Sequence, residues 1–362
     1  SSHALAAKAG HMRVWEIGDY TKIKDPNGLA LHIVERPNPK PGPGEVVMKV
    51  RATGINARDL TIMRGGMGPK PQPFTRVPLS DNAGDVLAVG PGVDRVKVGD
   101  RVTMTHYWQW IDGKWHGDMA QKDFASNIDG FLAEQIVVPA EPLIKLPDSM
   151  SYEDASTLQS AGLTSWNAVI CAGAAKPGDT VLTIGTGGVS LYGLQWAKMV
   201  GATSIITSSS DEKLTKMRAL GADITINYRT TPNWAQEVLN KTGGRGADIV
   251  LNNVGIQEME NCLLACASNG KVMFIGANPV NRSRTVETPA GLTRFPNLIM
   301  KDLTIKGIIV GSRRMFEDLI AAMTAHKVKA VIDRVFPFEQ AREAVAYMES
   351  ADRLGKVVIK VQ

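Results

Sequence analysis

In the second half of the chain, short apolar runs alternate with amphipathic segments of helical spacing. This alternation favours parallel strands connected by helices that cover both faces of the sheet. The sequence therefore predicts an α/β fold with a doubly wound parallel sheet over about residues 165–310. The six expected strands begin at Val181, Ser204, Asp223, Ala247, Lys271 and Leu303.

Polar residues, glycine and proline predict where the connecting helices begin and end. The carboxylate of Asp211 can cap the helix after the second strand, and Gly221 is suited to its C-terminal end. Thr231 and Pro232 supply a capping residue and a first-turn proline for the next helix.

The first part of the chain has the period-two pattern of β-strands. Gly44–Thr53 and Ala83–Val89 alternate apolar and polar residues, and proline-glycine turns separate such segments. Another apolar strand, Gly355–Val361, lies near the other end of the chain. We therefore expect residues 13–164 and 311–362 to form a second, β-rich domain. We interpret residues 1–12 as a cloning remnant that ends at Met12. They are not interpreted as a signal peptide, because they lack a long apolar core.

A glycine-rich turn joins the first apolar run to a helix. Gly185 permits a tight turn, Gly187 lets the backbone approach a phosphate, and the helix directs its free N–H groups at the anion. Ser190 stands where the dinucleotide fingerprint has its third glycine, and an ordinary strand-to-helix loop would look similar. The following strand and helix alternation favours a dinucleotide site. Its turn consists of Gly185, Thr186, Gly187, Gly188, Val189 and Ser190.

The end of the second strand indicates which dinucleotide binds. An NAD site places an acid there, about 20 residues after the glycines. Here the strand ends in serines, and Asp211 is better explained as a helix cap. Because Ser208, Ser209 and Lys213 can donate to a 2′-phosphate, we expect NADP(H) to be preferred. Lys213 could equally be a solvated helix residue.

Composition excludes several classes of protein. No apolar run reaches the roughly 18 residues of a membrane span, and the three cysteines lack a CxxC spacing, so we expect a soluble, cytoplasmic protein with reduced core thiols. The net charge of +5 is spread along the chain without a basic run interleaved with aromatics, which makes nucleic-acid binding an unfavoured interpretation.

Four motifs resemble those of the medium-chain dehydrogenase/reductase superfamily, over essentially all of Met12–Gln362. They are Gly54–Asp59, Pro78–Gly84, Val98–Val102 and Gly185–Val189. The resemblance is to the zinc-independent, quinone oxidoreductase-like branch. It implies a GroES-like catalytic domain beside the Rossmann domain, and a homodimer or homotetramer formed through the Rossmann domain.

The resemblance also extends the predicted cofactor site. In similar reductases a lysine and a tyrosine hold the 2′-phosphate, and Lys213 and Tyr228 match them; Thr164 is a further candidate. Residues after the strand ends should border the nicotinamide half of the cofactor. These residues are Asn253, Val254, Ile275, Gly276, Val310, Gly311 and Ser312.

The positions that hold catalytic zinc in related alcohol dehydrogenases carry other residues here. Asn56 replaces a cysteine, Asp81–Asn82 a His-Glu pair, and Ser160 a second cysteine; residues 103–135 also lack the cysteines of a structural zinc lobe. Catalytic zinc needs about three nitrogen or sulfur ligands and one open position. We therefore expect no zinc, and we regard a hard-metal site at Asp59 and Asp81 as a remote alternative.

Without a Lewis acid, hydride transfer to a conjugated acceptor is easier than to a simple carbonyl. Asn56, Arg58 and Tyr107 are the candidates for hydrogen bonding to the acceptor oxygen. Asn56 could instead only shape its loop, Arg58 could be an ion-pair partner of Asp59 or Asp81, and Tyr107 could be a packing residue.

The segment His106–His116 contains three of the seven tryptophans. It could stack a flat acceptor, or it could pack on a neighbouring subunit. The sequence as a whole predicts an NADPH-dependent reductase of quinones or α,β-unsaturated carbonyls. A zinc-free alcohol or aldehyde dehydrogenase and a nonenzymatic, NADPH-binding protein with an RNA-binding or structural role are the alternatives.

Overall fold

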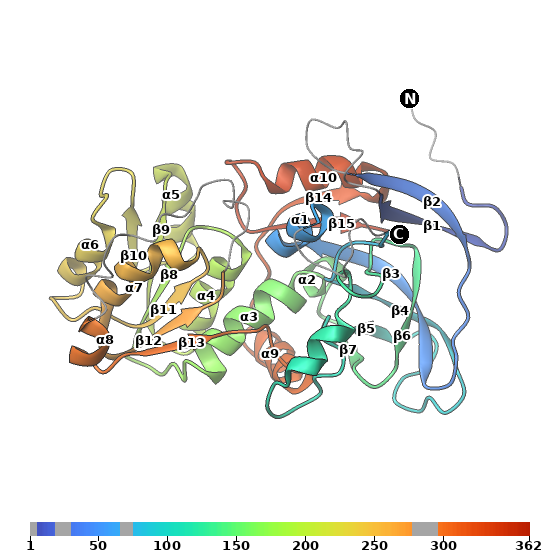
Figure 1. Cartoon of the computed structure of the whole chain (residues 1–362), viewed down its shortest axis with the longest axis horizontal. Helices are drawn as coiled ribbons and strands as arrows, with labels where there is room; N and C mark the ends of the chain where they lie inside the picture. Colours follow the sequence, from blue (N-terminus) through green and yellow to red (C-terminus); the bar gives the residue numbers. More distant parts are fainter. Residues whose placement is uncertain (1–5, 19–29, 66–74, 277–295) are drawn as a thin grey trace. The chain divides into compact units, whose positions relative to one another are not determined.

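The computed structural model describes residues 6–18, 30–65, 75–276 and 296–362. The chain divides into two units (Figure 1). The first unit comprises Ser1–Ser160 and Gly311–Gln362, and the second comprises Ala161–Val310. Within the described ranges, no helix combines the length and the apolar character needed to cross a bilayer.

The second unit is built around a parallel sheet with the strand order β10-β9-β8-β11-β12-β13. The chain starts in the middle at β8, moves outward to β10, returns at β11 and continues to β13. This is the doubly wound order expected from the sequence. The strands are β8 (Thr180–Ile184), β9 (Thr203–Ser208), β10 (Ile224–Asn227), β11 (Ala247–Asn252), β12 (Cys266–Phe274) and β13 (Thr304–Gly307).

Alternate residues of β8 pack against different layers of helices. Leu182 and Ile184 lie in an apolar core that includes residues of α6 and α7. Thr183 faces α4, where Gly193 packs so closely that a Cβ atom would lie 2.9 Å from the Thr183 methyl group. The helices of this unit are α3 (Leu163–Trp166), α4 (Gly188–Met199), α5 (Asp211–Ala219), α6 (Trp234–Lys241), α7 (Met259–Ala265) and α8 (Pro296–Met300).

Two helix starts differ from the sequence prediction. Ser210, and not Asp211, caps α5, because the Ser210 hydroxyl accepts a hydrogen bond from the Lys213 amide at 3.3 Å. The Asp211 carboxylate accepts one from the Asn227 side chain at 2.8 Å instead. Helix α6 begins at Trp234 after Asn233, so Thr231 and Pro232 precede it.

The first unit is mostly β-structure. A two-stranded ribbon of β1 and β2 accompanies a sheet with the order β14-β15-β3-β4-β5-β7, in which β6 also pairs with β3. The strands are β1 (His11–Ile17), β2 (Leu31–Pro37), β3 (Glu45–Ile55), β4 (Ala83–Val89), β5 (Arg101–Thr103), β6 (Gln135–Pro139), β7 (Ile144–Lys145), β14 (Ile332–Pro337) and β15 (Lys356–Lys360). The helices are α1 (Ala57–Met63), α2 (Tyr152–Ala155), α9 (Arg313–Ala325) and α10 (Ala341–Met348).

Strand β15 returns to the first unit, as the sequence predicts. It pairs parallel with β14 and antiparallel with β3, and Val357 lies opposite Ile55. This register brings the first residue of β15, Lys356, beside the end of β3, where helix α1 starts.

None of the three cysteines, all of which lie in the described ranges, forms a disulfide. Cys262 and Cys266 are buried, and burial raises the pKa of the Cys266 thiol to about 12. Cys171 is exposed, which corrects the expectation that all three lie in the core.

Candidate active site

The end of β3 positions Asn56 at the start of α1. Its extended backbone (φ −128°, ψ 161°) marks the N-cap, and its N–H donates to the Asp59 carboxylate at 2.7 Å. This bond is one half of a capping box, and it satisfies the backbone at the helix start. The Asn56 side chain makes a different contact, with Lys356.

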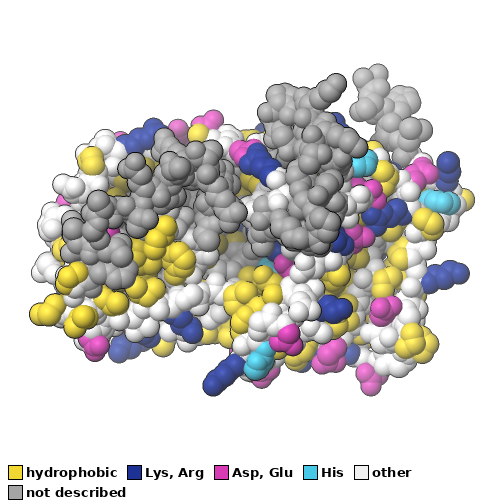
Figure 2. Space-filling view, in the orientation of Figure 1, with side chains coloured by type: hydrophobic (Ala, Val, Ile, Leu, Met, Phe, Trp, Pro, Cys, Tyr) yellow, Lys and Arg dark blue, Asp and Glu magenta, His cyan; other side chains and the backbone are white. Residues whose placement is uncertain are grey.

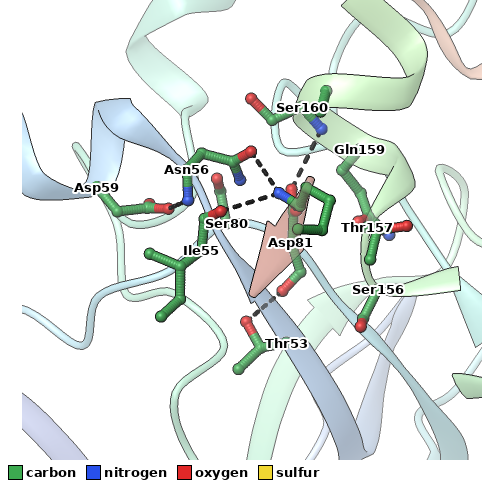
Figure 3. A network of polar contacts seen from close by, with 12 residues as sticks. Thr53, Ile55, Asn56, Asp59, Ser80, Asp81, Ser156, Thr157, Gln159 and Ser160 are labelled. Carbon is green, nitrogen blue, oxygen red and sulfur yellow. Dashed lines mark hydrogen bonds and ion pairs between the residues drawn. The ribbon is translucent and has the colours of Figure 1, made fainter. Parts of the chain in front are cut away.

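Asn56, Asp81 and Ser160, which match the zinc-ligand positions, lie close together (Figure 3). The first two contact a buried lysine. The Lys356 ammonium group donates to Asn56 Oδ1 at 2.6 Å, to Asp81 Oδ2 at 3.0 Å and to the Ile55 carbonyl at 2.9 Å. The other oxygen of Asp81 accepts the Ser160 backbone N–H at 3.1 Å. Lys356 is only 2% exposed, so this is a buried ion pair whose hydrogen-bonding capacity is largely used.

The Asn56 amide nitrogen has no hydrogen-bond partner among the described residues, although it is buried. The whole residue is 8% exposed. Because Oδ1 faces an ammonium group, the amide cannot be flipped without placing its NH₂ group against a cation. Nδ2 is therefore a donor with a fixed orientation and no partner in the described part of the chain, and an unpaired buried donor is unusual in a folded protein.

Arg58 forms an ion pair with Asp123, which the sequence did not indicate as a partner. Its guanidinium contacts the Asp123 carboxylate at 2.5 Å, and not Asp59 or Asp81. Burial raises the pKa of Asp123 to about 6, although the nearby Arg58 charge opposes that rise. One nitrogen of Arg58 and one oxygen of Asp123 lack partners in the described part of the chain.

Tyr107 and His106 lie next to this pair. Tyr107 forms a β-bridge with Asp123, and its ring centroid lies 4.5 Å from that of His106. Burial raises the pKa of Tyr107 to about 12, so the phenol is protonated at neutral pH. His106 is fully buried with both ring nitrogens unpartnered among described atoms, and burial holds its pKa well below the usual value. Its imidazole is therefore neutral.

The tryptophan segment packs on itself within the first unit. Trp115 makes edge-to-face contacts with Tyr107 at 5.0 Å and with Trp110 at 5.2 Å. The Trp110 indole donates to the Gly113 carbonyl at 3.0 Å. Stacking of the segment His106–His116 on an acceptor, or its packing on another subunit, stays a prediction.

The donor set at Asn56, Asp81 and Ser160 does not fit zinc. Zinc in proteins is typically held by thiolates, imidazoles and carboxylates in a tetrahedral arrangement. Here one carboxylate, one amide and one hydroxyl are present, and the Lys356 ammonium contacts two of these groups directly. The Asn82 amide is engaged with the backbone of Ser80 and Met104. Within the described ranges, no cluster of three or more His, Cys, Asp or Glu residues could hold a metal.

A pocket of about 430 Å³ lies elsewhere in the first unit. Its walls include Val14, Val77, Phe124 and Ile136, and none of the candidate catalytic residues lines it.

The glycine turn of the second unit joins β8 to the N-terminus of α4. Gly185 has a φ of +80°, which favours glycine, and Gly187 is the N-cap of α4 with no side chain to satisfy the first N–H groups. Ser190 replaces the third glycine. Its hydroxyl donates to the Ile184 carbonyl at 2.7 Å and accepts from the Asn253 amide at 3.0 Å. The serine thus ties α4 to two strand ends.

The ends of β11 and β12 approach each other closely. The Ile275 amide donates to the Asn252 carbonyl at 2.9 Å, and a Cβ atom on Gly276 would lie 2.1 Å from the Asn253 carbonyl oxygen. Only glycine fits there. Val254 is half-buried beside them, while Thr164 is buried in α3 and the Val310 carbonyl accepts from Asn167 at 2.9 Å.

The residues predicted to hold the 2′-phosphate lie at one edge of the sheet. Tyr228 donates its backbone N–H to the Ser208 carbonyl at 3.1 Å, and the Ser208 hydroxyl accepts the Ser210 amide at 3.3 Å. Ser209 and Lys213 are half-buried. Gly311 and Ser312 belong to the first unit, where Ser312 caps α9, so their cofactor role stays a prediction.

Charges of both signs are interspersed on the face shown in Figure 2. Several surface cations are paired with acids, for example Lys198 with Asp223 and Arg245 with Asp248. Among the described residues visible on that face, positive side chains are mixed with negative ones.

A doubly wound sheet with a glycine turn, together with a separate β-rich unit carrying a buried polar site, defines a two-domain dehydrogenase or reductase. Comparison with protein families agrees. Residues 42–148 match the alcohol dehydrogenase GroES-like domain, and residues 188–325 match the zinc-binding dehydrogenase family. The chain belongs to the medium-chain dehydrogenase/reductase superfamily, and it is an oxidoreductase.

Known proteins similar to this chain span nearly its full length. A zinc-type alcohol dehydrogenase-like protein of Schizosaccharomyces pombe is 37% identical over 89% of this chain and 92% of its own. A structure of an NAD-dependent alcohol dehydrogenase is 31% identical with a TM-score of 0.83, covering 97% of this chain and 100% of its own. A mycobacterial protein complexed with NADPH is 26% identical with a TM-score of 0.76 and the same coverage.

Proposed function

We propose that this protein is a zinc-independent, NADPH-dependent reductase that delivers hydride to a quinone or an α,β-unsaturated carbonyl. The observation that carries the proposal is the buried, unpartnered Asn56 Nδ2 donor in a site whose donor set does not suit zinc. A fixed amide donor can hydrogen-bond an acceptor oxygen as negative charge develops on it. A conjugated acceptor needs less such stabilisation than a simple carbonyl, because it spreads the charge.

The second unit supplies the elements that a dinucleotide requires. The turn at Gly185–Ser190 and the N-terminus of α4 would hold the pyrophosphate. The bound cofactor would supply the hydride. The chain's own residues bind and orient it, and Gly276 lets the chain after β12 approach the Asn253 carbonyl closely.

NADPH is the proposed cofactor because β9 ends in serines, at the place where an NAD-specific site carries an acid that accepts a ribose hydroxyl. Asp211 follows at the start of α5, and its carboxylate accepts a hydrogen bond from the Asn227 side chain. Ser208, Ser209, Lys213 and Tyr228 would instead surround a 2′-phosphate. Among the similar proteins, one is named for NAD and one is complexed with NADPH.

The names of similar proteins support a second candidate, a zinc-free alcohol or aldehyde dehydrogenase. One experiment separates the two: NADPH oxidation by the purified protein, with and without a chelator, against quinones, enones, aldehydes and, in reverse, alcohols. Chelator-resistant turnover of quinones or enones supports the proposal. Turnover confined to aldehydes and alcohols supports the second candidate, and loss of activity in chelator overturns zinc independence.

We also propose that two copies associate through the second unit. Strand β13 is exposed along its length, and Ile299 and Met300 of α8 are 82% and 80% exposed. An open strand edge beside apolar side chains favours pairing with a second copy. Light scattering of the native protein and of Ile305→Lys, which places a charge on this edge, would test the association.

A further inference from the structure

Lys356 is an uncommon residue for a protein interior. A lysine is almost never fully buried unless its charge is paired, because removing the ammonium group from water is costly. Here all three N–H bonds find acceptors: the Ile55 carbonyl, Asn56 Oδ1 and Asp81 Oδ2. The cation is therefore held in one place by partners from two other segments of the first unit.

The partners of Lys356 are the same residues that match zinc-ligand positions in related alcohol dehydrogenases. Its ammonium contacts Asn56 and Asp81 directly, and Ser160 binds the second oxygen of the same Asp81 carboxylate. A fixed positive charge thus lies where these positions converge. A divalent cation could enter only by displacing that ammonium group.

The contact with Asn56 also has a chemical consequence. The Lys356 ammonium donates to Oδ1 of the Asn56 amide. The amide nitrogen, Nδ2, is therefore the atom that has no partner among the described residues. A neutral side chain at this position would permit either orientation of the amide. The orientation of the proposed substrate donor is therefore set by Lys356.

We propose that Lys356 is the internal cation of this site: it takes the place of a metal ion and positions Asn56 so that Nδ2 donates to the substrate oxygen. The second part rests on the proposed reductase function. The first part concerns only what occupies the space among Asn56, Asp81 and Ser160. Lys356 acts through Asn56 and Asp81 and is a positioning residue.

The metal-replacement part can be tested without any catalytic activity. Zinc ligands are installed by Asn56→Cys, Asp81→His and Ser160→Cys, once with Lys356 retained and once with Lys356→Met added. Isothermal titration with zinc chloride and circular dichroism are recorded for both. We expect the folded variant with Lys356→Met to bind one zinc ion, and the variant that retains Lys356 to bind it about 10–100-fold more weakly. Equal affinity, or no zinc binding by a folded Lys356→Met variant, would overturn this part.

The positioning part is tested with a mutant cycle in the full-length protein. Lys356→Met is combined with Asp81→Asn, so that no buried carboxylate is left without a cation. This pair should lower kcat about 10²-fold while leaving the dissociation constant for NADPH unchanged. Asn56→Ala should lower kcat to a similar extent, and all three changes together should lower it no further. The positioning role would be overturned if the loss of kcat in the triple variant equalled the product of the separate losses. A normal kcat in the Lys356→Met and Asp81→Asn double variant would also overturn it.

A half-buried lysine that also donates to backbone carbonyls controls for general effects of removing an amine. Lys271 of the second unit donates to the carbonyls of Ala172 and Gly173, so Lys271→Met should lower thermal stability without lowering kcat. If the wild-type protein reduces none of the acceptors, the proposed function fails. The zinc titration still decides whether Lys356 replaces a metal.

Discussion

Lys356 and Asn56 are 300 residues apart in the chain, and the ammonium of one lies 2.6 Å from the amide oxygen of the other. Their contact joins the last strand of the first unit to the helix start that follows β3. It makes the Asn56 side chain directional, with an engaged oxygen and a nitrogen free to donate. The proposed chemistry of the protein depends on that direction.

Replacing Asn56 by Asp should distinguish the role of the amide oxygen from that of the amide nitrogen. Asn56→Asp keeps an oxygen for Lys356 and removes the Nδ2 donor, so kcat for the preferred acceptor should fall about 10²–10³-fold, as when an oxyanion donor is removed. Steady-state kinetics with a saturating cofactor measures the loss. Asn240→Asp, on the surface of the second unit, is the control. An unchanged kcat in Asn56→Asp would show that Asn56 only shapes its loop.

Lys213 and Tyr228 should set the cofactor preference. Hydrogen bonds to charged groups contribute roughly 1.5–3 kcal/mol, so Lys213→Ala should weaken NADPH binding about 10–100-fold and Tyr228→Ala should weaken it in the same direction. The affinity for NADH should be unaffected, and fluorescence titration measures both. Lys216→Ala is the control, because Lys216 forms a surface ion pair with Glu212. Equal losses for the two cofactors would contradict a 2′-phosphate site.

Asp59 should make stability depend on pH. Burial raises its pKa from 3.8 to about 7; Asp81 adds to the rise, while Arg58, Lys356 and the Asn56 backbone oppose it. Because the folded state holds this proton more tightly than the unfolded state, the stabilisation is complete below pH 4. It is lost as the pH rises through about 7.

The variant Asp59→Asn keeps an oxygen that can accept the Asn56 backbone N–H, and its side chain cannot ionise. Its free energy of unfolding should therefore lack a loss on the order of a few kcal/mol that the wild type shows between pH 4 and 7. Denaturant unfolding across this range, with exposed Asp148→Asn as the control, provides the comparison. Parallel curves for wild type and Asp59→Asn would refute the raised pKa.

Gly276 should be intolerant of any side chain. A Cβ atom there would lie 2.1 Å from the Asn253 carbonyl oxygen, so Gly276→Ala must push apart the ends of β11 and β12 and weaken NADPH binding. Gly307→Ala is a matched control, because nothing lies within 4 Å of its Cβ position. Similar NADPH dissociation constants for both variants would argue against a cofactor site at this edge.

The sheet of the second unit could be predicted because its strands are continuous apolar runs separated by helices. The prediction of a strand over Ala247–Asn252 is confirmed residue for residue. Helix caps were less certain, because Ser210 and Asp211 are both good capping residues and adjacent in sequence; only the backbone conformation distinguishes them.

The candidate site could be predicted only in part. Asn56 and Asp81 lie in two of the motifs that carry the family resemblance, and Ser160 matches a zinc-ligand position, but no motif indicates the cation that contacts them. Lys356 lies in an apolar strand, where a lysine usually marks the solvent side, and its carboxylate partner is 275 residues away. Asp123 was missed for a similar reason: it lies in an irregular segment 65 residues after Arg58, and no local pattern connects the two.

The burial of Lys356 also gives the native protein an internal reporter. At 2% exposed, its amine is shielded from acylating reagents that label surface lysines within minutes. Acylation at this position therefore requires that the first unit opens around β15. The rate of acylation at Lys356, followed by peptide mass spectrometry, would report on this opening. A ligand that stabilises the closed form of the site would lower that rate.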